Sequence, residues 1–204
     1  MRNTHDVRGN TGENLPKTSY RTFYPLSTVR CEGAPVFRSQ RARDVACLLD
    51  VDDAVISWTC MPSAIDGNGQ RYVPDFLVTA AGRDPYYVDA PDRSELGPNK
   101  LRETPNGEAR RLVALTEDEL RSGFRLANAK DLLRYGSYTA PLGDRLRLLA
   151  ALDEHGTLTL AESLSAFQES KPVAALASLI LHAYVEVDLD TASLGPETIV
   201  RRKR

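Results

Sequence analysis

The chain has 204 residues, of which 42% are hydrophobic and 26% are charged, with a formal net charge of −2 at pH 7. This length and composition suit one large domain or two small ones with a buried core. A strongly basic, nucleic-acid-binding composition is excluded, although a local basic patch is not. No apolar run approaches the roughly 18 residues of a membrane span, and the polar N-terminus has no apolar signal core. We therefore expect a cytoplasmic protein that does not bind membranes.

The three cysteines, Cys31, Cys47 and Cys60, are widely spaced and form no Cys-x-x-Cys pair. The three histidines, at positions 5, 155 and 182, are also far apart in the sequence. Such spacings give little support to a zinc site or a disulfide framework. We therefore expect the three thiols to be reduced.

Residues 1–19 are polar and rich in Asn, Gly and Thr, a composition typical of a flexible arm. The segment 37–49 then has apolar residues at helical spacing, with arginines on the opposite side. Its apolar face consists of Ala42, Val45, Ala46 and Leu49. This spacing predicts the first helix of the chain.

Three segments with the composition of β-strands come next, at residues 54–61, 71–80 and 86–90. The sequence Asp-Gly-Asn-Gly at 66–69 predicts a hairpin turn between the first two. A second turn, Ala-Gly-Arg-Asp-Pro at 81–85, is predicted between the last two. We therefore expect these strands to pair in chain order.

Residues 91–109 are rich in Pro, Gly and Asn and predict a loop, which a further strand follows at 110–115. Thr116 and Glu119 have the spacing of a capping box, with Thr116 as the N-cap of a helix. That helix is predicted to continue to Tyr135, where the next residue, a glycine, ends it.

The last third of the chain predicts three helices and then two short strands around a Gly-Pro turn. The helices are expected at 142–156, 157–167 and 170–184, the last with Ser170 as its cap and Pro172 in its first turn. This order is the layout of a winged helix-turn-helix domain. The predicted organisation is an arm (1–19), an α/β domain (20–136) and a winged-helix domain (137–204).

The stretch Tyr-Val-Pro-Asp-Phe at 72–76 places a carboxylate, Asp75, within an apolar strand. Side chains alternate along a strand, so Asp75 shares a face with the residues two positions away. Asp89 lies near the end of the next strand, and the two carboxylates approach each other if these strands pair. Nearby carboxylates repel unless a cation bridges them or one is protonated. Two such acids suit Mg²⁺, which assists phosphodiester hydrolysis.

Four segments in this order resemble the TnsA-type transposon endonucleases of the PD-(D/E)XK nuclease superfamily. They are "RSQRARD" (38–44), "MP" (61–62), "YVPDF" (72–76) and "VDAP" (88–91), and the resemblance extends over roughly residues 20–200. It implies an α/β fold with a PD-(D/E)XK restriction-endonuclease-like core, a mixed sheet flanked by helices, and a winged helix after it. It also implies Mg²⁺-dependent DNA cleavage and contact with a transposition ATPase or transposase.

The chain departs from this family pattern at most of the positions on which catalysis depends. Ala42 stands where the family has its helical glutamate, Arg38 stands at the glutamate of a Glu-Ser pair, and Pro91 stands at the catalytic lysine. Asp75 is unchanged, and Asp89 is a shorter substitute for Glu or Gln. Each lost general base or charge-stabilising group costs about 10²- to 10⁴-fold in rate. We therefore predict a retained fold in which the two aspartates are vestigial catalytic and metal-binding residues.

Ordinary structural roles are also open for both acids. An aspartate that follows a proline at a strand edge often hydrogen-bonds to turn amides, and Asp75 has this context. A carboxylate at a strand end, such as Asp89, is more often solvated than bound to a metal.

The expected winged-helix domain gives weak signs of sequence-specific DNA recognition. The outward positions of its third helix are predicted to be Lys171, Ala174, Ala175, Ser178 and His182. None of these is an Arg, Asn or Gln able to read base edges, so phosphate contacts are the stronger expectation. The candidate DNA-binding residues are Arg41, Arg43, Lys171, Arg201, Arg202, Lys203 and Arg204.

Three functional hypotheses follow from the sequence. The first is a TnsA-like protein with a degenerate site, which binds DNA or a transposition-type protein partner without cutting. The second is an active Mg²⁺- or Mn²⁺-dependent endonuclease that uses Asp75, Asp89 and a replacement lysine. The third is a winged-helix regulator or adaptor in which the nuclease-like half is a scaffold.

Overall fold

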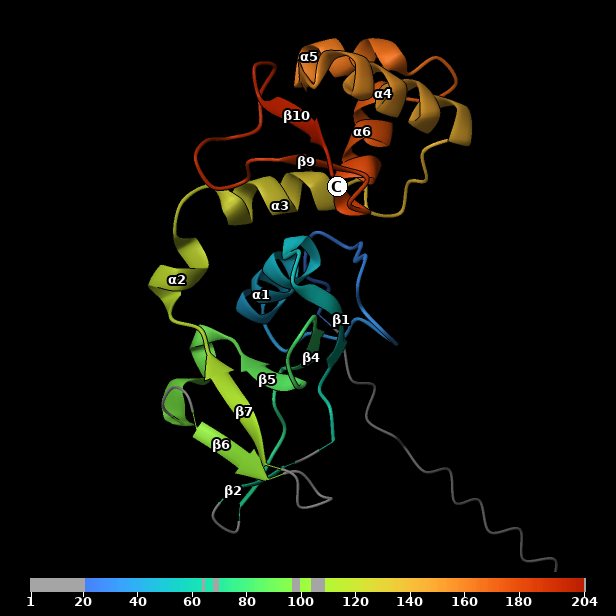
Figure 1. The fold of residues 1–204 in the computed structure, drawn as a ribbon. Coiled ribbons are helices and arrows are strands. Elements are labelled where there is room, and N and C mark those ends of the chain that lie inside the picture. The colour runs from blue at the N-terminus through green and yellow to red at the C-terminus, as the bar shows by residue number, and fades with distance from the viewer. Residues whose placement is uncertain (1–20, 64, 68–69, 97–99, 104–108, 204) are drawn as a thin grey trace, which may run out of the picture.

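The computed structural model describes residues 21–63, 65–67, 70–96, 100–103 and 109–203. Within these residues the protein is mixed α/β, as the sequence predicts, and has a sheet-containing unit and a mainly helical unit on either side of helix α3 (Arg125–Leu133) (Figure 1). The predicted arm at 1–19 lies outside the described residues. Among the helices that the structure describes, none is long and apolar enough to span a membrane.

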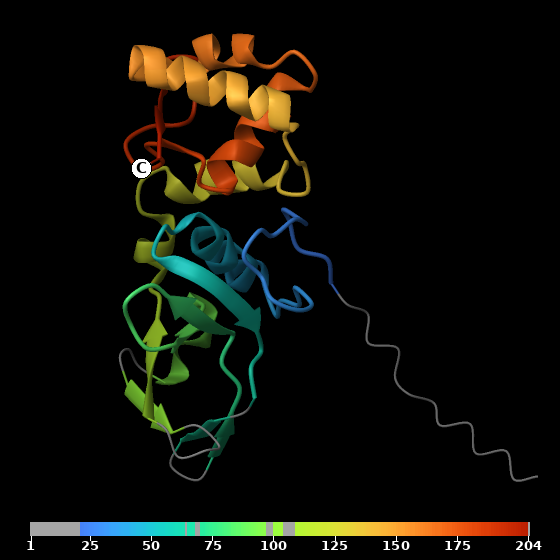
Figure 2. The same cartoon turned by 45° about the vertical axis from the view of Figure 1, so that its right-hand side comes forward.

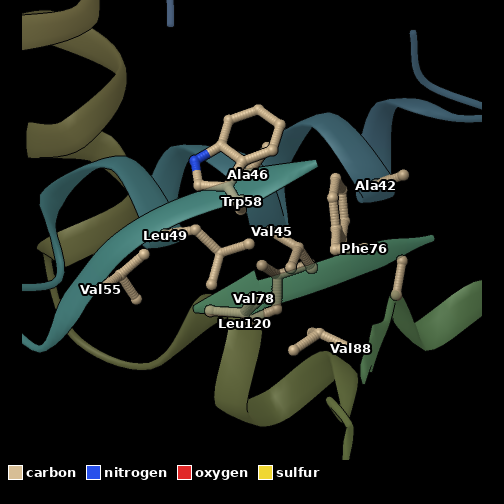
Figure 3. Packing of buried hydrophobic residues seen from close by; sticks show 11 residues of the cluster. Ala42, Val45, Ala46, Leu49, Val55, Trp58, Phe76, Val78, Val88 and Leu120 are labelled. Carbon is tan, nitrogen blue, oxygen red and sulfur yellow. The ribbon is translucent and has the colours of Figure 1, made fainter. Parts of the chain in front are cut away.

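Helix α1 (Gln40–Val51) packs on the sheet and builds the core of the first unit. It begins after Ser39, whose side chain accepts a hydrogen bond from the backbone N–H of Ala42. This cap places the helix start three residues after the predicted position. Its apolar face packs against Trp58 and Phe76, whose rings meet edge-on with centroids 5.6 Å apart (Figure 3).

The strands of the first sheet that the structure describes have the order β1-β4-β5-β7-β6-β2-β3. Strands β1 (Val55–Cys60), β4 (Phe76–Ala80) and β5 (Tyr86–Asp89) are antiparallel neighbours. Strand β7 (Ala109–Ala114) is parallel to β5, which makes the sheet mixed. The far side consists of β6 (Lys100–Glu103), β2 (Ile65–Gly67) and β3 (Gln70–Tyr72).

Two predictions for the sheet are wrong in detail. The predicted strand 71–80 is interrupted between Tyr72 and Phe76, because Pro74 has no N–H to donate to a strand ladder. The Asp-Gly-Asn-Gly segment therefore connects β2 with β3, whereas β1 pairs with β4 across a longer connection. The predicted loop 91–109 contains a 3₁₀ turn, η1 (Pro91–Leu96), and strand β6.

The predicted helix at 116–135 is divided into α2 (Glu117–Arg121) and α3. The capping box is confirmed, because Thr116 and Glu119 each accept a hydrogen bond from the other's backbone N–H. The division begins at Ser122, whose backbone is extended (φ −64°, ψ 131°), and Gly123 follows with a left-handed φ of 63°. The chain turns there, and α3 packs against α1.

The second unit contains helices and a small antiparallel sheet in which β10 (Ile199–Arg202) lies between β8 (Thr157–Thr159) and β9 (Val185–Val187). Strand β8 was expected to be part of a helix, but its residues pair with β10. The helical elements are α4 (Leu142–His155), α5 (Leu160–Ser163), the 3₁₀ turn η2 (Leu164–Ala166) and α6 (Pro172–Leu181).

The predicted cap of α6 is wrong. Lys171, not Ser170, directly precedes the helix, and the Ser170 hydroxyl donates to the buried carboxylate of Asp144. Pro172 lies in the first turn of α6, as predicted.

Helix α3 lies between the two units (Figure 2). A hydrophobic cluster joins it to both of them. The cluster contains Cys47 from α1, Ala129 and Leu133 from α3, and Ala177 and Leu181 from α6, all buried. The predicted boundary between residues 136 and 137 follows directly after the helix that both units share.

Candidate functional site

The sheet brings Asp75 and Asp89 together. Asp75 directly precedes β4, Asp89 ends β5, and the two strands are paired with Phe76 opposite Val88. The Asp75 backbone N–H donates to Asp89 Oδ1 at 2.9 Å, and the Ala90 N–H donates to Asp75 Oδ2 at 3.0 Å. Both aspartates are buried, at 3% and 1% exposure. The two acids therefore form one pocket, as the strand alternation predicts.

Two side chains occupy the remaining carboxylate oxygens. Arg38, in the turn before α1, donates to Asp75 Oδ1 at 2.6 Å, and the Tyr72 hydroxyl donates to Asp89 Oδ2 at 2.6 Å. Each of the four carboxylate oxygens thus accepts a hydrogen bond from the protein. A cation is already present beside Asp75, and it is a guanidinium.

A second arginine, Arg93, completes the pocket. Its Nη1 lies 4.0 Å from Asp75 Oδ1, its Nε donates to the Tyr72 hydroxyl at 3.2 Å, and its guanidinium carbon lies 4.6 Å from the centre of the Tyr72 ring. Nη2 also donates to the Val73 carbonyl at 3.3 Å. Sequence reasoning missed Arg93, because it lies in a segment that was expected to be a loop and no spacing relates it to either acid.

The pocket favours neutral Tyr72 and opposes ionisation of Asp89. Burial raises the pKa of Asp89 above its usual value, although the hydrogen bonds from Tyr72 and from the Asp75 N–H partly offset this effect. Burial, together with the hydrogen bond to Asp89, also raises the pKa of Tyr72. The phenol therefore keeps its proton and acts as a donor.

The donor set does not fit Mg²⁺. This ion needs near-octahedral oxygen ligands and usually keeps several waters, but here both carboxylates are almost fully buried and the Arg38 guanidinium already donates to Asp75. The helical position Ala42 is buried against the sheet, and Pro91 opens η1, so neither supplies an acid or an amine. Over the part of the chain that the structure describes, no three His, Cys, Asp or Glu residues are grouped to hold a metal ion.

The prediction that Arg43 binds DNA is wrong. Its side chain is fully buried, with Nε donating to the Pro25 carbonyl and Nη2 to the Ser27 carbonyl, both at 2.7 Å. The guanidinium also lies over the ring of Phe37. Arg43 is buried because the chain before α1 folds over this side of the helix and its carbonyls accept hydrogen bonds from the guanidinium.

Arg41 and Lys171 are exposed, as a DNA contact requires. Arg41 Nε is 2.8 Å from Glu117 Oε2, in an ion pair whose side chains are 49% and 37% exposed. An exposed pair of this kind is weak and exchanges readily with other partners.

Three of the predicted outward positions on α6 are buried. Ala174, Ala175 and Ser178 are at most 5% exposed, because α6 packs on its own unit along one side and on α3 along another. The predicted exposure of these positions is therefore wrong. Lys171 at the helix start and His182 after its end are exposed.

The basic C-terminal residues lie in strand β10 and just after it. Arg201 is exposed, Arg202 pairs with Asp153, and Lys203 pairs with Asp53 of the first unit. Arg204 is outside the described residues. Residues 137–204 contain nine Asp and Glu and seven Lys and Arg, so this unit has no net positive charge.

A scan against protein-family models finds no match for this sequence, and a search of curated proteins finds none. The resemblance to TnsA-type endonucleases stays a prediction from the sequence.

Proposed function

We propose that the protein is a TnsA-like nuclease fold that does not hydrolyse DNA and acts as a binding component of a DNA-processing assembly. The observation that carries this proposal is the Arg38–Asp75 bond. A guanidinium donates at 2.6 Å to the carboxylate that a catalytic metal would use in the family that the sequence resembles.

The order of elements is compatible with a PD-(D/E)XK core. A helix, an antiparallel strand pair, an acid-bearing strand and a parallel strand β7 follow one another, and both acids lie at strand ends in one pocket. What is lacking is the chemistry, because the aligned helical and basic positions are Ala42 and Pro91. Two such losses remove about 10⁴-fold or more in rate, which leaves little hydrolysis above background.

The order of elements in the second unit supports a winged-helix fold whose role is protein contact. Four helical elements and three short strands follow in the order α4-β8-α5-η2-α6-β9-β10, which is compatible with that fold. A DNA-reading winged helix inserts its third helix into the major groove. Here the corresponding helix, α6, is covered by α3, and two basic residues near the C-terminus are paired with acids. A protein partner, such as a transposition ATPase or transposase, suits this surface better than base readout.

The absence of hydrolysis is tested by incubating supercoiled plasmid with the full chain and Mg²⁺ or Mn²⁺. We expect nicking no faster than in buffer with either metal. Nicking that disappears in Asp75→Asn but persists in Asp92→Asn, a nearby exposed acid, would establish an active endonuclease instead.

The contribution of DNA is tested by the salt dependence of duplex affinity. We expect weak, sequence-independent binding that falls steeply with salt, because phosphate contacts release counterions. The double variant Arg41→Glu/Arg201→Glu should weaken it and flatten the salt slope, whereas Arg134→Glu, at an exposed arginine directly after helix α3, serves as the control. Equal losses of duplex affinity in the two variants would show that DNA is attracted by the overall charge of the protein and not bound at Arg41 and Arg201.

A further inference from the structure

Two cysteines that are far apart in the sequence lie next to each other beside strand β1. Cys31 forms a parallel bridge with Trp58, in which the Trp58 N–H donates to the Arg30 carbonyl at 3.0 Å and the Glu32 N–H donates to the Trp58 carbonyl at 2.8 Å. Cys60 follows Trp58 by two residues and therefore shares its face. Both cysteines are partly buried against the core cluster that contains Trp58.

The Cys31 thiol lies on the side of the bridge toward Cys60. Cys31 Sγ lies 3.9 Å from the carbonyl oxygens of Glu32 and of Gly33, so it leans along the chain, which in a parallel bridge is the direction from Trp58 to Cys60. Each thiol also shifts the pKa of the other, as neighbouring ionisable groups do. The third cysteine, Cys47, is fully buried in the cluster shared by α1, α3 and α6.

The environments of the two thiols give them different reactivities. The neighbouring Cys31 thiol lowers the pKa of Cys60, and the N–H of Val36 and the charge of Arg43 act in the same direction against burial. The neighbouring Cys60 thiol, and burial, raise the pKa of Cys31. Cys60 is therefore the better nucleophile, and Cys31 is placed to react second.

We propose that Cys31 and Cys60 are a thiol–disulfide site that is oxidised by exchange with a small disulfide such as oxidised glutathione. The Cys60 thiolate attacks one glutathione sulfur, the glutathione disulfide bond breaks, and one glutathione leaves. Cys31 then loses its proton and attacks Cys60 Sγ, which releases the second glutathione. The two cysteines lose two electrons and two protons, and one oxidised glutathione takes them up as two thiols.

The disulfide links two segments that flank the carboxylate pocket. Cys31 belongs to the segment before α1, whose Pro25 and Ser27 carbonyls hold Arg43. Cys60 ends β1, and the N–H of the following Met61 donates to the Asp75 carbonyl at 2.8 Å. The site thus fixes the start of α1 to the sheet edge, and it does not depend on whether the pocket hydrolyses DNA.

The test is to treat the folded chain with oxidised glutathione, quench with acid, and label the remaining thiols with N-ethylmaleimide in denaturant. We expect one label per chain, at Cys47, against three in the untreated protein, and a linked peptide that joins Cys31 to Cys60. Three labels after treatment, or a linked peptide that contains Cys47, would overturn the proposal.

Two variants separate the steps. Cys47→Ser should still form the linked peptide, because Cys47 lies in a different cluster. Cys31→Ser should stop at a glutathione adduct on Cys60, because the second thiol is missing. An adduct on Cys60 in the wild-type chain, without the linked peptide, would contradict the assigned role of Cys31.

Discussion

The carboxylate pocket of the first unit and helix α6 of the second are kept from outside partners in different ways. In the pocket, Asp75 is neutralised by Arg38, whose side chain is still 30% exposed. Helix α6 is covered by packing, with Leu176 facing its own unit and Leu181 facing α3. A single substitution removes the ion pair, whereas α6 is exposed only if the units separate. The neutralisation of Asp75 thus depends on one local ion pair, whereas the burial of α6 depends on the packing of the two units against each other.

The largest expected effect is in the shared core. Leu133→Ala removes a fully buried side chain from the cluster between the units and should lower the free energy of unfolding by about 3 kcal/mol. Urea titration followed by circular dichroism and by the fluorescence of Trp58, the one tryptophan, measures it. The control is Leu146→Ala, at an exposed leucine, where a change within about 0.5 kcal/mol is expected.

If the Leu133→Ala variant leaves the Trp58 transition unchanged, the two units do not stabilise each other. The contrast between the local ion pair of Asp75 and the burial of α6 between the two units would then be wrong.

The next effect is at the pocket. Asp75→Ala leaves Arg38 and the Ala90 N–H without their acceptor and should lower the free energy of unfolding by about 2 to 3 kcal/mol. Glu117→Ala breaks the exposed pair with Arg41 and should cost less than about 1 kcal/mol. Equal effects in the two variants would show that Asp75 is not a structural anchor.

A smaller effect concerns pH. Burial raises the folded-state pKa of Asp89, so the folded protein holds a proton that the unfolded chain releases near pH 3.8. Stability should therefore fall as pH rises from that value through the raised folded pKa. In Asp89→Asn this contribution disappears. Urea titrations across the acidic range should therefore show that the variant gains stability relative to wild type as the pH rises. An unchanged difference at all pH values would refute the burial effect.

The smallest effect is at the basic strand. Arg202→Ala removes an exposed pair with Asp153 and should change the free energy of unfolding by less than about 1 kcal/mol, with a smaller change at high salt. A loss of stability as large as that expected for Asp75→Ala would show that the Arg202–Asp153 pair stabilises the fold as much as the contacts of Asp75 do.

The sequence predicts the parts of the fold that depend on local patterns. The apolar spacing predicts α1, the β-strand composition between turn signals predicts β1, β4 and β5, and the Thr116–Glu119 box predicts the start of α2. It does not predict the division after α2, because a serine and a glycine inside a helical pattern are tolerated in many helices, whereas here Ser122 is extended and Gly123 has a positive φ. Strand β6 exists through its pairing with β7, which no local pattern records.

In the candidate site, too, local patterns predict one part, whereas contacts between residues distant in the sequence determine the rest. The proximity of Asp75 and Asp89 is predicted from strand alternation, which is a local rule. The partnership of Asp75 with Arg38 spans 37 positions and depends on how α1 meets the sheet. The burial of Ala174 and Ala175 was missed because small residues fit an exposed helix face and a packed helix face equally well.

Metal binding tests most directly whether a guanidinium takes the place of the cation in the pocket. Calorimetric titration of Mn²⁺ into the full wild-type chain should show no saturable site, because the Arg38 guanidinium already neutralises Asp75 and both acids are almost fully buried. A single saturable site that is lost in Asp75→Asn would contradict the account.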